Sequence, residues 1–458
     1  MVCDGEERAV EQRERAESAA RQAAAQLTAR DVRGVALTWV DNAGISRVKA
    51  VPTSRLAHAA RWGVGASPSF DVYLVDDSAV TSRHIGGPDG DLRLFPDLDR
   101  LTVLAAQPGW AWAPVDRYEQ QGVPYVACQR GFARRMADAA QARGLRLSMG
   151  FETEWVVTHA NGHEPPRYAC SGPAYGMTRM IELSDYLRDV LDALTAQRVE
   201  VLQIHPEYSP GQFEVSVAPT DPVDAADLSV LVRETIRAVS LRHGLDASFA
   251  PVVEPGGVGN GAHLHLSLWQ DERNLCRGGD GPCGMTRECE AFLAGVLREL
   301  PALLALGAPT PASYLRLEPS RWAGVYQCWG LEAREAALRF ITGAPDDVLG
   351  ANAEVKCFDP AANPYLVTGA VIAAGLAGLD EGLVLPAPAA GDPAVTGGQV
   401  RLPTSLAEAL EHFERSELLR TALGDPLFEA IAAVRAGEVK LFEGLAPKDI
   451  ASATRRRY

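Results

Sequence analysis

The segment that most constrains this chain is residues 259–268, which read Gly-Asn-Gly-Ala-His-Leu-His-Leu-Ser-Leu. Apolar and polar side chains alternate along it, which predicts a strand with one face in the core. The polar face carries His263, His265 and Ser267. Two neighbouring imidazoles beside a glycine-rich turn suit a metal ion or a phosphate group. A half-exposed strand with two solvated histidines is the alternative, and this segment alone favours that alternative.

Three other segments carry acidic side chains on the polar face of an alternating pattern. They are residues 151–155, residues 207–217 with a Pro-Gly turn, and residues 353–356. Their acids are Glu152, Glu154, Glu207, Glu214 and Glu354. On adjacent strands these carboxylates would repel one another without a counter-charge. Because Mg²⁺ and Mn²⁺ bind carboxylate oxygens and tolerate an imidazole, the pattern favours a divalent-metal site over separate solvated acids.

The composition narrows the classes of function. A chain of 458 residues can bury a large core and predicts two domains. A net charge of −15 argues against nucleic acid or an anionic membrane surface as the main partner. The charged, alanine-rich opening does not read as a signal peptide, and the apolar run 365–379 is too short to span a bilayer. We therefore expect a cytoplasmic protein in which residues 365–379 form a buried helix.

The order of expected elements indicates an α+β fold. Residues 5–30 predict a charged helix, and residues 35–40 and 45–51 predict a hairpin. Further strands are expected at 92–95 and 102–105, helices at 128–142, 221–243 and 405–434, and a loop at 385–398.

Nucleotide binding by a standard glycine motif is excluded. Gly257, Gly259 and Gly261 are spaced like part of a dinucleotide-binding fingerprint, but a strand follows them where that fingerprint needs a helix. The sequence also contains no Gly-Lys pair and hence no P-loop.

The order of the motifs resembles the glutamine synthetase superfamily. Glu-x-Glu at 152–154, the two acids around Pro-Gly-Gln, and Gly-Ala-His-x-His-x-Ser come first. They are followed by matching segments at 313–317, 334–339, 354–356 and 362–366. The resemblance covers roughly residues 30–440 and rests on an ordered series of motifs.

This resemblance implies a domain organisation and an assembly. A charged helix at 1–30 would precede a β-grasp-like domain at 31–115, and a catalytic α/β domain with a curved antiparallel sheet would occupy 116–458. The assembly would be a homo-oligomer, either a hexameric ring or a double-ring dodecamer.

The resemblance also implies ATP-dependent amide formation through a γ-glutamyl phosphate. Phosphorylation turns a carboxylate oxygen into a leaving group for an amine, and metals with arginines stabilise the charge at the transferred phosphate. The implied cofactors are ATP and two Mg²⁺ or Mn²⁺ ions per site. One metal would be held by Glu154, Glu207 and Glu214, and the other by Glu152, His263 and Glu354.

The remaining site residues are assigned by the same resemblance. His265, Ser267 and Arg339 would bind the nucleotide, and Arg334 would face the transferring phosphoryl group. Arg316, Gly259 and Lys356 would bind the acid substrate. Asp71 would contact the amine from a neighbouring subunit, although its motif survives only as Phe-Asp. Each arginine could instead form a structural ion pair.

Two departures from the family pattern concern the substrate. Val258 replaces the asparagine that contacts glutamate, and Trp322 replaces the flap glutamate that takes a proton from ammonium. An aromatic face can hold an alkylammonium group by cation–π attraction. The chain therefore resembles γ-glutamylamine ligases, which join glutamate to a small organic amine. An ammonia-using glutamine synthetase and a non-catalytic regulatory or scaffold homologue remain as alternatives.

Overall fold

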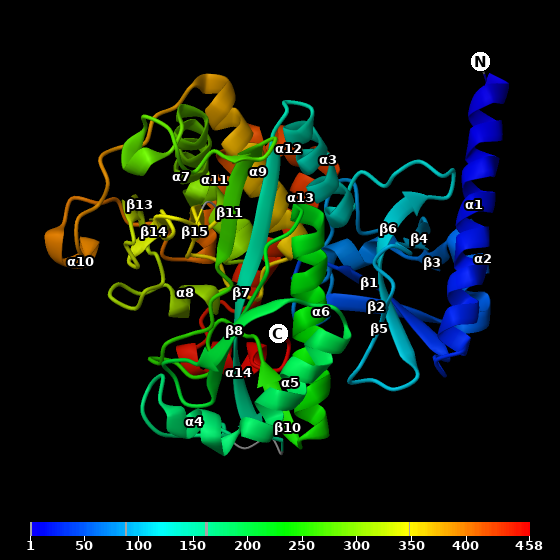
Figure 1. Ribbon diagram of the computed structural model, residues 1–458, viewed down its shortest axis with the longest axis horizontal. Helices are drawn as coiled ribbons and strands as arrows, with labels where there is room; N and C mark the ends of the chain where they lie inside the picture. The colour runs from blue at the N-terminus through cyan, green and yellow to red at the C-terminus, as the bar shows by residue number, and fades with distance from the viewer. Residues whose placement is uncertain (1, 88, 161–163, 348) are drawn as a thin grey trace.

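The computed structural model describes residues 2–87, 89–160, 164–347 and 349–458, and its strands form two sheets. Figure 1 shows the smaller sheet with the long helix α1 on one side of the molecule and the larger sheet with most helices on the other. Within the described residues, no helix combines the length and the apolar character needed to cross a membrane.

The N-terminal part of the chain forms a six-stranded sheet in the order β2-β1-β6-β4-β3, with β5 beside β6. Its elements are α1 (Val2–Thr28), β1 (Gly34–Val40), β2 (Ser46–Pro52), η1 (Thr53–Arg55), α2 (Leu56–Trp62), β3 (Val64–Ala66), η2 (Pro68–Val72), β4 (Leu92–Pro96), β5 (Thr102–Val103) and β6 (Trp110–Glu119). The predicted charged helix and hairpin are both present, although residue 1 lies outside the described residues. The domain division stays a prediction, and its boundary at residue 115 falls inside β6.

The hairpin turn of β1 and β2 fixes the N-terminal sheet against the rest of the chain. Gly44 adopts φ +83°, and a Cβ atom on it would lie 1.8 Å from the carbonyl oxygen of Ala361. The side chain of Asn363 donates hydrogen bonds of 3.0 Å to the carbonyls of Val40 and Asp41. The turn therefore needs a glycine, because the backbone of another segment lies directly against it.

The remaining strands form a nine-stranded sheet in the order β13-β14-β15-β11-β7-β9-β8, with β10 beside β7 and β12 beside β11. Its strands are β7 (Arg146–His159), β8 (Val201–Pro206), β9 (Gln212–Val217), β10 (Leu245–Ser248), β11 (Leu264–Gln270), β12 (Arg273–Asn274), β13 (Tyr326–Leu331), β14 (Ala336–Ile341) and β15 (Asn352–Val355). The pairs are antiparallel as expected, except that β13 and β14 run parallel. The sheet and its helices confirm the α+β class.

The helices of this part are α3 (Gln129–Gln141), α4 (Met177–Glu182), α5 (Ser184–Ala196), α6 (Pro222–Arg242), η3 (Pro282–Gly284), α7 (Arg287–Gly307), α8 (Ser313–Arg316), α9 (Pro364–Glu381), α10 (Pro393–Thr396), α11 (Leu406–Arg415), α12 (Glu417–Leu423), α13 (Asp425–Leu441) and α14 (Pro447–Thr454). The predictions at 128–142, 221–243 and 365–379 are confirmed as α3, α6 and α9. The helix expected at 405–434 is divided into α11, α12 and α13, because Ser416 caps the second helix and Gly424 ends it. The loop at 385–398 contains one helical turn, α10.

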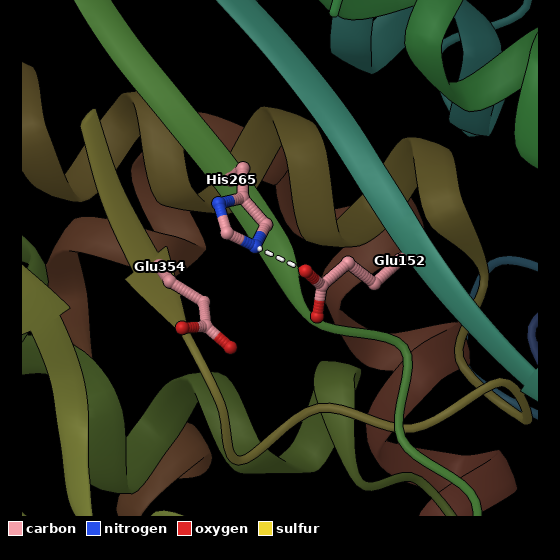
Figure 2. A group of neighbouring side chains, drawn as sticks. All are labelled: Glu152, His265 and Glu354. Atoms are coloured by element: carbon pink, nitrogen blue, oxygen red, sulfur yellow. Dashed lines mark ion pairs between the residues drawn. The ribbon is translucent and has the colours of Figure 1, made fainter. Parts of the chain in front are cut away.

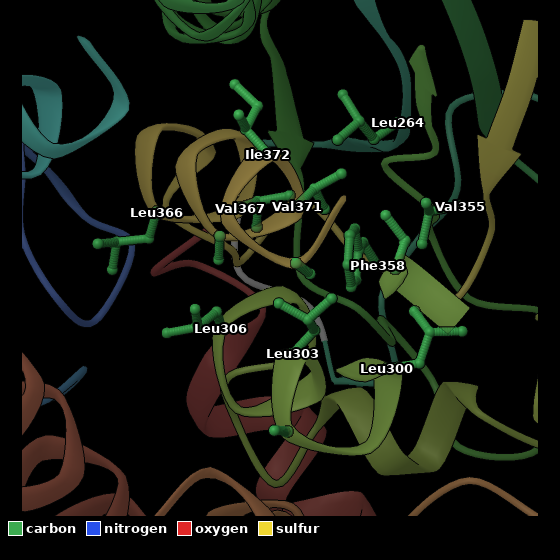
Figure 3. Close-up of a cluster of buried hydrophobic side chains, with 14 of the residues drawn as sticks. Leu264, Leu300, Leu303, Leu306, Val355, Phe358, Leu366, Val367, Val371 and Ile372 are labelled. Carbon is green, nitrogen blue, oxygen red and sulfur yellow. The ribbon is translucent and has the colours of Figure 1, made fainter. Parts of the chain in front are cut away.

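The main core lies where α7 and α9 pack beneath the sheet. Figure 3 shows Leu300, Leu303 and Leu306 of α7 facing side chains of α9, with Leu264 and Val355 of the sheet nearby. Helix α9 is apolar on nearly all sides and is buried from Pro364 to Leu376. Such a helix is stable only inside a core, which accounts for the apolar run in the sequence.

We expect Gly295→Ala to destabilise this helix contact. A Cβ atom on Gly295 would lie 2.2 Å from the carbonyl oxygen of Ala374 and 2.8 Å from the Cα of Gly378, so α7 would have to move away from α9. Overpacking of this kind costs about 1–3 kcal/mol of unfolding free energy. Urea unfolding measures it, with Gly87→Ala as the control because that glycine is exposed and has open space around it. Equal unfolding free energies for the two variants would contradict the prediction.

Candidate active site

One cavity gathers most of the residues that the sequence singled out. Its volume is about 560 Å³. It is lined by Glu152, Glu154, Tyr175, Gln203, His205, Glu207, Glu214, Val258, Gly259, His263, His265, Arg316, Arg321, Trp322, Ala323, Arg334, Arg339, Ile341 and Lys356. The acids come from the β7, β8 and β9 side of the sheet, and the arginines come from β14 and from the loops around α8 and β13. The cavity therefore has an acidic wall and a basic wall.

The strand register brings the predicted acids and histidines together. His265 on β11 pairs with Glu354 on β15, and Glu154 on β7 pairs with Glu214 on β9. Strand β11 also runs antiparallel to β7, so the chain just before β11 lies beside Glu152. The period-two alternation then turns these side chains to one face.

The first cluster consists of Glu152, His265 and Glu354, whose ligand atoms lie within 4.8 Å of one another. Figure 2 shows the three side chains converging from β7, β11 and β15. His265 Nε2 lies 3.1 Å from Glu152 Oε1. His263 Nδ1 also reaches this cluster, at 2.9 Å from Glu152 Oε2 and 3.2 Å from Glu354 Oε1. The resemblance assigned His263 here, and the structure adds His265.

The tautomer of His265 suits metal binding. Its Nδ1 atom lies 2.9 Å from Asn352 Oδ1, an acceptor that holds the ring proton on Nδ1. Its Nε2 atom is buried and lies 3.1 Å from Glu152 Oε1. Burial opposes a charge on the ring, but the hydrogen bond with Glu152 and the charge of Glu354 raise the pKa of His265 to about 9. A divalent cation would bind Nε2 in place of its proton, while Nδ1 still donates to Asn352.

The acids of the first cluster are held ionised. Burial opposes the charge on Glu152, but hydrogen bonds with His263 and His265 outweigh burial and lower the pKa. Burial also opposes the charge on Glu354, whose pKa is well below its usual range because Lys356 and His263 lie beside it. Lys356 Nζ is 2.9 Å from Glu354 Oε1, and Arg339 Nη1 is 3.1 Å from Glu354 Oε2. This cluster is already partly neutralised by the protein.

The second cluster consists of His205, Glu207 and Glu214, with Glu154 beside it. His205 Nε2 lies 3.3 Å from Glu214 Oε1, and His205 Nδ1 lies 3.5 Å from Glu207 Oε1. Burial and the nearby carboxylates of Glu214 and Glu207 raise the pKa of Glu154 to about 8. The hydrogen bond to Glu214 raises the pKa of His205 to about 9. These carboxylates are crowded and lack a buried lysine or arginine partner among the described residues, which fits a cation site.

His205 is a site residue that the sequence reasoning missed. The signal was available, since His205 and Glu207 are two positions apart and share a strand face. Because Pro206 and a turn follow His205, only the acids of this segment were predicted as site residues.

The turn before β11 is fixed by buried side chains. Gln212 Nε2 donates to Glu154 Oε2 at 2.9 Å and to the carbonyl of Gly259 at 3.0 Å. Asn260 Nδ2 donates to the carbonyl of Ala250 at 2.8 Å. A Cβ atom on Gly259 would lie 2.1 Å from a backbone oxygen, so only glycine allows this close approach.

The basic wall has unused hydrogen-bond donors. Arg316 is buried, its Nη2 atom donates to the carbonyl of Lys356 at 3.1 Å, and its Nη1 atom has no partner among the described residues. The Arg334 guanidinium carbon lies 5.4 Å from the centre of the Trp322 ring. One face of this tryptophan is therefore occupied by a cation of the protein itself.

Three predicted site residues do not line the cavity: Glu354, which is buried directly behind its surface, Asp71 and Ser267. Asp71 is 0% exposed, and both of its carboxylate oxygens accept hydrogen bonds from Arg117, at 2.9 and 3.0 Å. A carboxylate buried in such an ion pair has no surface to offer a neighbouring subunit, so the expected amine contact is not supported. Ser267 is also buried, and its hydroxyl accepts a hydrogen bond of 2.8 Å from the Trp269 indole.

A second cavity, of about 780 Å³, lies at the far end of β7 against α6, β10 and α14. Its lining includes Arg455, which pairs with Glu164 at 2.7 Å, and Arg456, which lies 3.8 Å from Asp246. The clustered metal-binding groups lie in the first cavity.

We expect the protein to bind two Mn²⁺ ions and the Glu152→Ala variant to bind one. Removing this carboxylate takes a ligand from the first cluster and leaves the second intact. Isothermal titration calorimetry with Mn²⁺ gives the stoichiometry, and Glu200→Ala is the control because that side chain is exposed. Two unaltered binding events in Glu152→Ala would rule out the assignment.

The His205→Ala variant tests the second cluster. Loss of this imidazole should weaken Mn²⁺ binding at one of the two sites by about 10–100-fold while the other is unchanged. The same titration measures it, with His412→Ala on α11 as the control. If Mn²⁺ affinity fell equally at both sites, His205 would not be a ligand of the second cluster alone.

Comparison with known proteins agrees with this geometry. A family profile described as glutamine synthetase, catalytic domain, matches residues 126–451. A gamma-glutamylpolyamine synthetase, GlnA3, of Streptomyces coelicolor is 56% identical over 443 residues, which cover 94% of this chain and 95% of that protein. A crystal structure of a novel glutamine synthase homolog superposes with a TM-score of 0.84 at 33% identity, covering 93% of this chain and 99% of the other. A GmaS/ADP complex has a TM-score of 0.82 at 25% identity, covering 92% and 96%.

Proposed function

Because this chain belongs to the glutamine synthetase family, we propose that it is an ATP-dependent ligase that joins glutamate to an organic amine. The observation that carries the proposal is the cavity in which two carboxylate–histidine clusters face Arg316, Arg334 and Arg339. An amide-forming site of this kind must hold a nucleotide phosphate, an acid and an amine together. Burying this many charged groups costs folding free energy, and a protein that acts only as a scaffold would not need them.

The chemistry proceeds in two steps. The γ-carboxylate of glutamate attacks the terminal phosphorus of ATP, which yields γ-glutamyl phosphate and ADP. The amine nitrogen then attacks the acyl carbon, phosphate leaves, and the amine loses a proton to give the amide. Divalent cations bound at the two clusters would neutralise the phosphate charge.

The residues of the basic wall supply the remaining interactions. Arg316 Nη1 has no hydrogen-bond partner in the part of the chain that the structure describes, so it can bind a carboxylate of the acid. Arg339 and Arg334 line the same cavity and can bind phosphate oxygens as charge develops. Lys356 and Gly259 also line it, in keeping with contacts to the acid. Ser267 is less suited to bind the nucleotide, because its hydroxyl already accepts a hydrogen bond from the Trp269 indole.

The amine is best taken as a polyamine or another organic amine. The 56% identity to a gamma-glutamylpolyamine synthetase supports a polyamine. An alkyl chain with a second ammonium group could lie along an acidic wall that ends at an indole ring. Since Arg334 covers one face of Trp322, the ring has its other face for the alkyl chain, and the side chain is 51% exposed. Ammonia has no alkyl chain, so contact with this surface would not strengthen its binding.

We also infer that the protein acts in the cytoplasm as a ring-shaped homo-oligomer, as a hexamer or as two stacked rings. Family membership supports this assembly. The two sheets also end in strands β2 and β8, on which Val48 and Leu202 are exposed apolar side chains suited to subunit contact.

Amine choice tests the proposed function. Phosphate release should depend on ATP, Mg²⁺ and glutamate, and putrescine or spermidine should exceed ammonium in kcat/KM by about a hundredfold, from methylene burial and cation–π contact. Trp322→Glu should shift the preference toward ammonium. The control is Trp62→Glu, because Trp62 is a similarly exposed tryptophan that also stacks with an arginine. A higher kcat/KM for ammonium than for every organic amine would favour an ordinary glutamine synthetase.

A further inference from the structure

The loop that carries Trp322 has an unfavourable backbone conformation. Ser320 has φ 57° and Trp322 has φ 56°, and neither residue is a glycine. Left-handed conformations of this kind persist only where surrounding contacts hold them. The contacts of residues 318–324 therefore decide where the Trp322 ring stands in the cavity.

Three interactions anchor this loop. The Ser320 hydroxyl donates to Asp392 Oδ2 at 3.0 Å, and Arg321 Nη1 donates to the carbonyls of Gly256 and Gly257 at 2.9 and 2.7 Å. These two anchors lie at the protein surface, where water competes for the same groups. The third anchor is the backbone N–H of Trp322, which donates to Glu335 Oε1 at 2.7 Å.

Glu335 is suited to hold the loop. Its side chain is 8% exposed, and its Oε2 atom is buried without a hydrogen-bond partner among the described residues. A hydrogen bond from a backbone N–H to a carboxylate is stronger inside a protein than at its surface. Burial raises the pKa of Glu335, and the hydrogen bond from Trp322 opposes that rise.

Glu335 is also adjacent in sequence to Arg334. The Arg334 guanidinium packs against the Trp322 ring at 5.4 Å, while the Glu335 carboxylate binds the Trp322 backbone. Two consecutive residues directly before β14 thus hold the tryptophan at its ring and at its amide. Glu335 itself does not line the cavity, and its hydrogen bond connects it to the cavity through Trp322.

We propose that Glu335 is a positioning residue that fixes the Trp322 loop and thereby sets how tightly the amine substrate binds. This inference rests on the proposed function for the identity of the substrate. It assigns Glu335 no contact with the reacting atoms. Loss of the Glu335 anchor would free the loop, so that the indole would no longer form a constant wall for the amine.

Two variants of Glu335 separate anchoring from general damage. Glu335→Ala removes the acceptor, whereas Glu335→Gln retains an oxygen that can accept from the Trp322 N–H. Glu318→Ala is the matched control, because Glu318 is an exposed acid of the same loop that pairs only with Arg321 among the described residues. All three proteins are compared with the wild type as full-length chains.

The first measurement is hydrogen–deuterium exchange of the peptide that covers residues 318–324, which needs no turnover. We expect faster exchange in Glu335→Ala and near-wild-type exchange in Glu335→Gln and Glu318→Ala. Unchanged exchange in Glu335→Ala would overturn the inference, whether or not the wild type forms an amide.

The second measurement is steady-state kinetics with an organic amine. In Glu335→Ala the amine KM should rise by about tenfold, while the KM values for ATP and glutamate and the kcat stay within about threefold of wild type. Glu335→Gln should restore the amine KM. An unchanged amine KM, or an equal rise in all three KM values, would contradict the positioning role. Absence of amide formation by the wild type would reject the proposed function alone, since exchange still tests the anchor.

Discussion

The crowding of carboxylates on neighbouring strands is the constraint around which the site is built. The antiparallel register brings acids of β7, β9 and β15 to one sheet face, with His265 of β11 between them. Such a face is unstable unless cations approach it. Among the described residues, Lys356 and Arg339 both form ion pairs with Glu354, and the charge of Arg316 acts on Glu154. The rest of the charge must be balanced by histidine protons or by bound cations.

The two clusters consequently differ in protonation. In the first, hydrogen bonds from histidines keep the pKa of Glu152 low, so its carboxylate is ready to bind a cation. In the second, burial and the neighbouring acids raise the pKa of Glu154 to about 8, so a cation that enters displaces a proton near neutral pH. Burial and the adjacent Glu214 act in the same direction on Glu207. Metal binding at the second cluster is therefore linked to proton release, and so is binding at His265 in the first, whose pKa is raised to about 9 by Glu152 and Glu354 against the effect of burial.

The strands and the polarity of their faces could be predicted from sequence, because alternation with period two follows directly from strand geometry. The buried helix α9 was predictable for a similar reason, since its apolar run leaves no polar face. Partners that depend on register were not predictable. Which histidine meets which acid is set by pairing between β11 and β15, and that pairing involves residues about ninety positions apart. His205 was missed because a single histidine two residues before an acid is an unremarkable pattern in sequence.

Asp71 and Trp322 show a second limit of sequence reasoning. Both were assigned by position in a motif, and a motif does not reveal what else contacts a side chain. Asp71 lies against Arg117 and Gln129 in a buried network, because the start of α3 packs over the N-terminal sheet. Trp322 meets Arg334 only because a loop and β14 fold beside each other. In each case the residue that changes the predicted role, Arg117 for Asp71 and Arg334 for Trp322, comes from a different part of the chain.

The location of these residues explains how one scaffold could serve different amines. Most carboxylates and histidines of the two clusters lie on paired strands, where main-chain hydrogen bonds fix the backbone of each residue within the sheet. Trp322 lies instead on a loop that few anchors hold in a left-handed conformation. A change in the loop can alter this part of the cavity surface without moving the strands that carry the clusters. Glu335 directly precedes β14, so the loop takes its position from the end of a strand in the same sheet that carries both clusters.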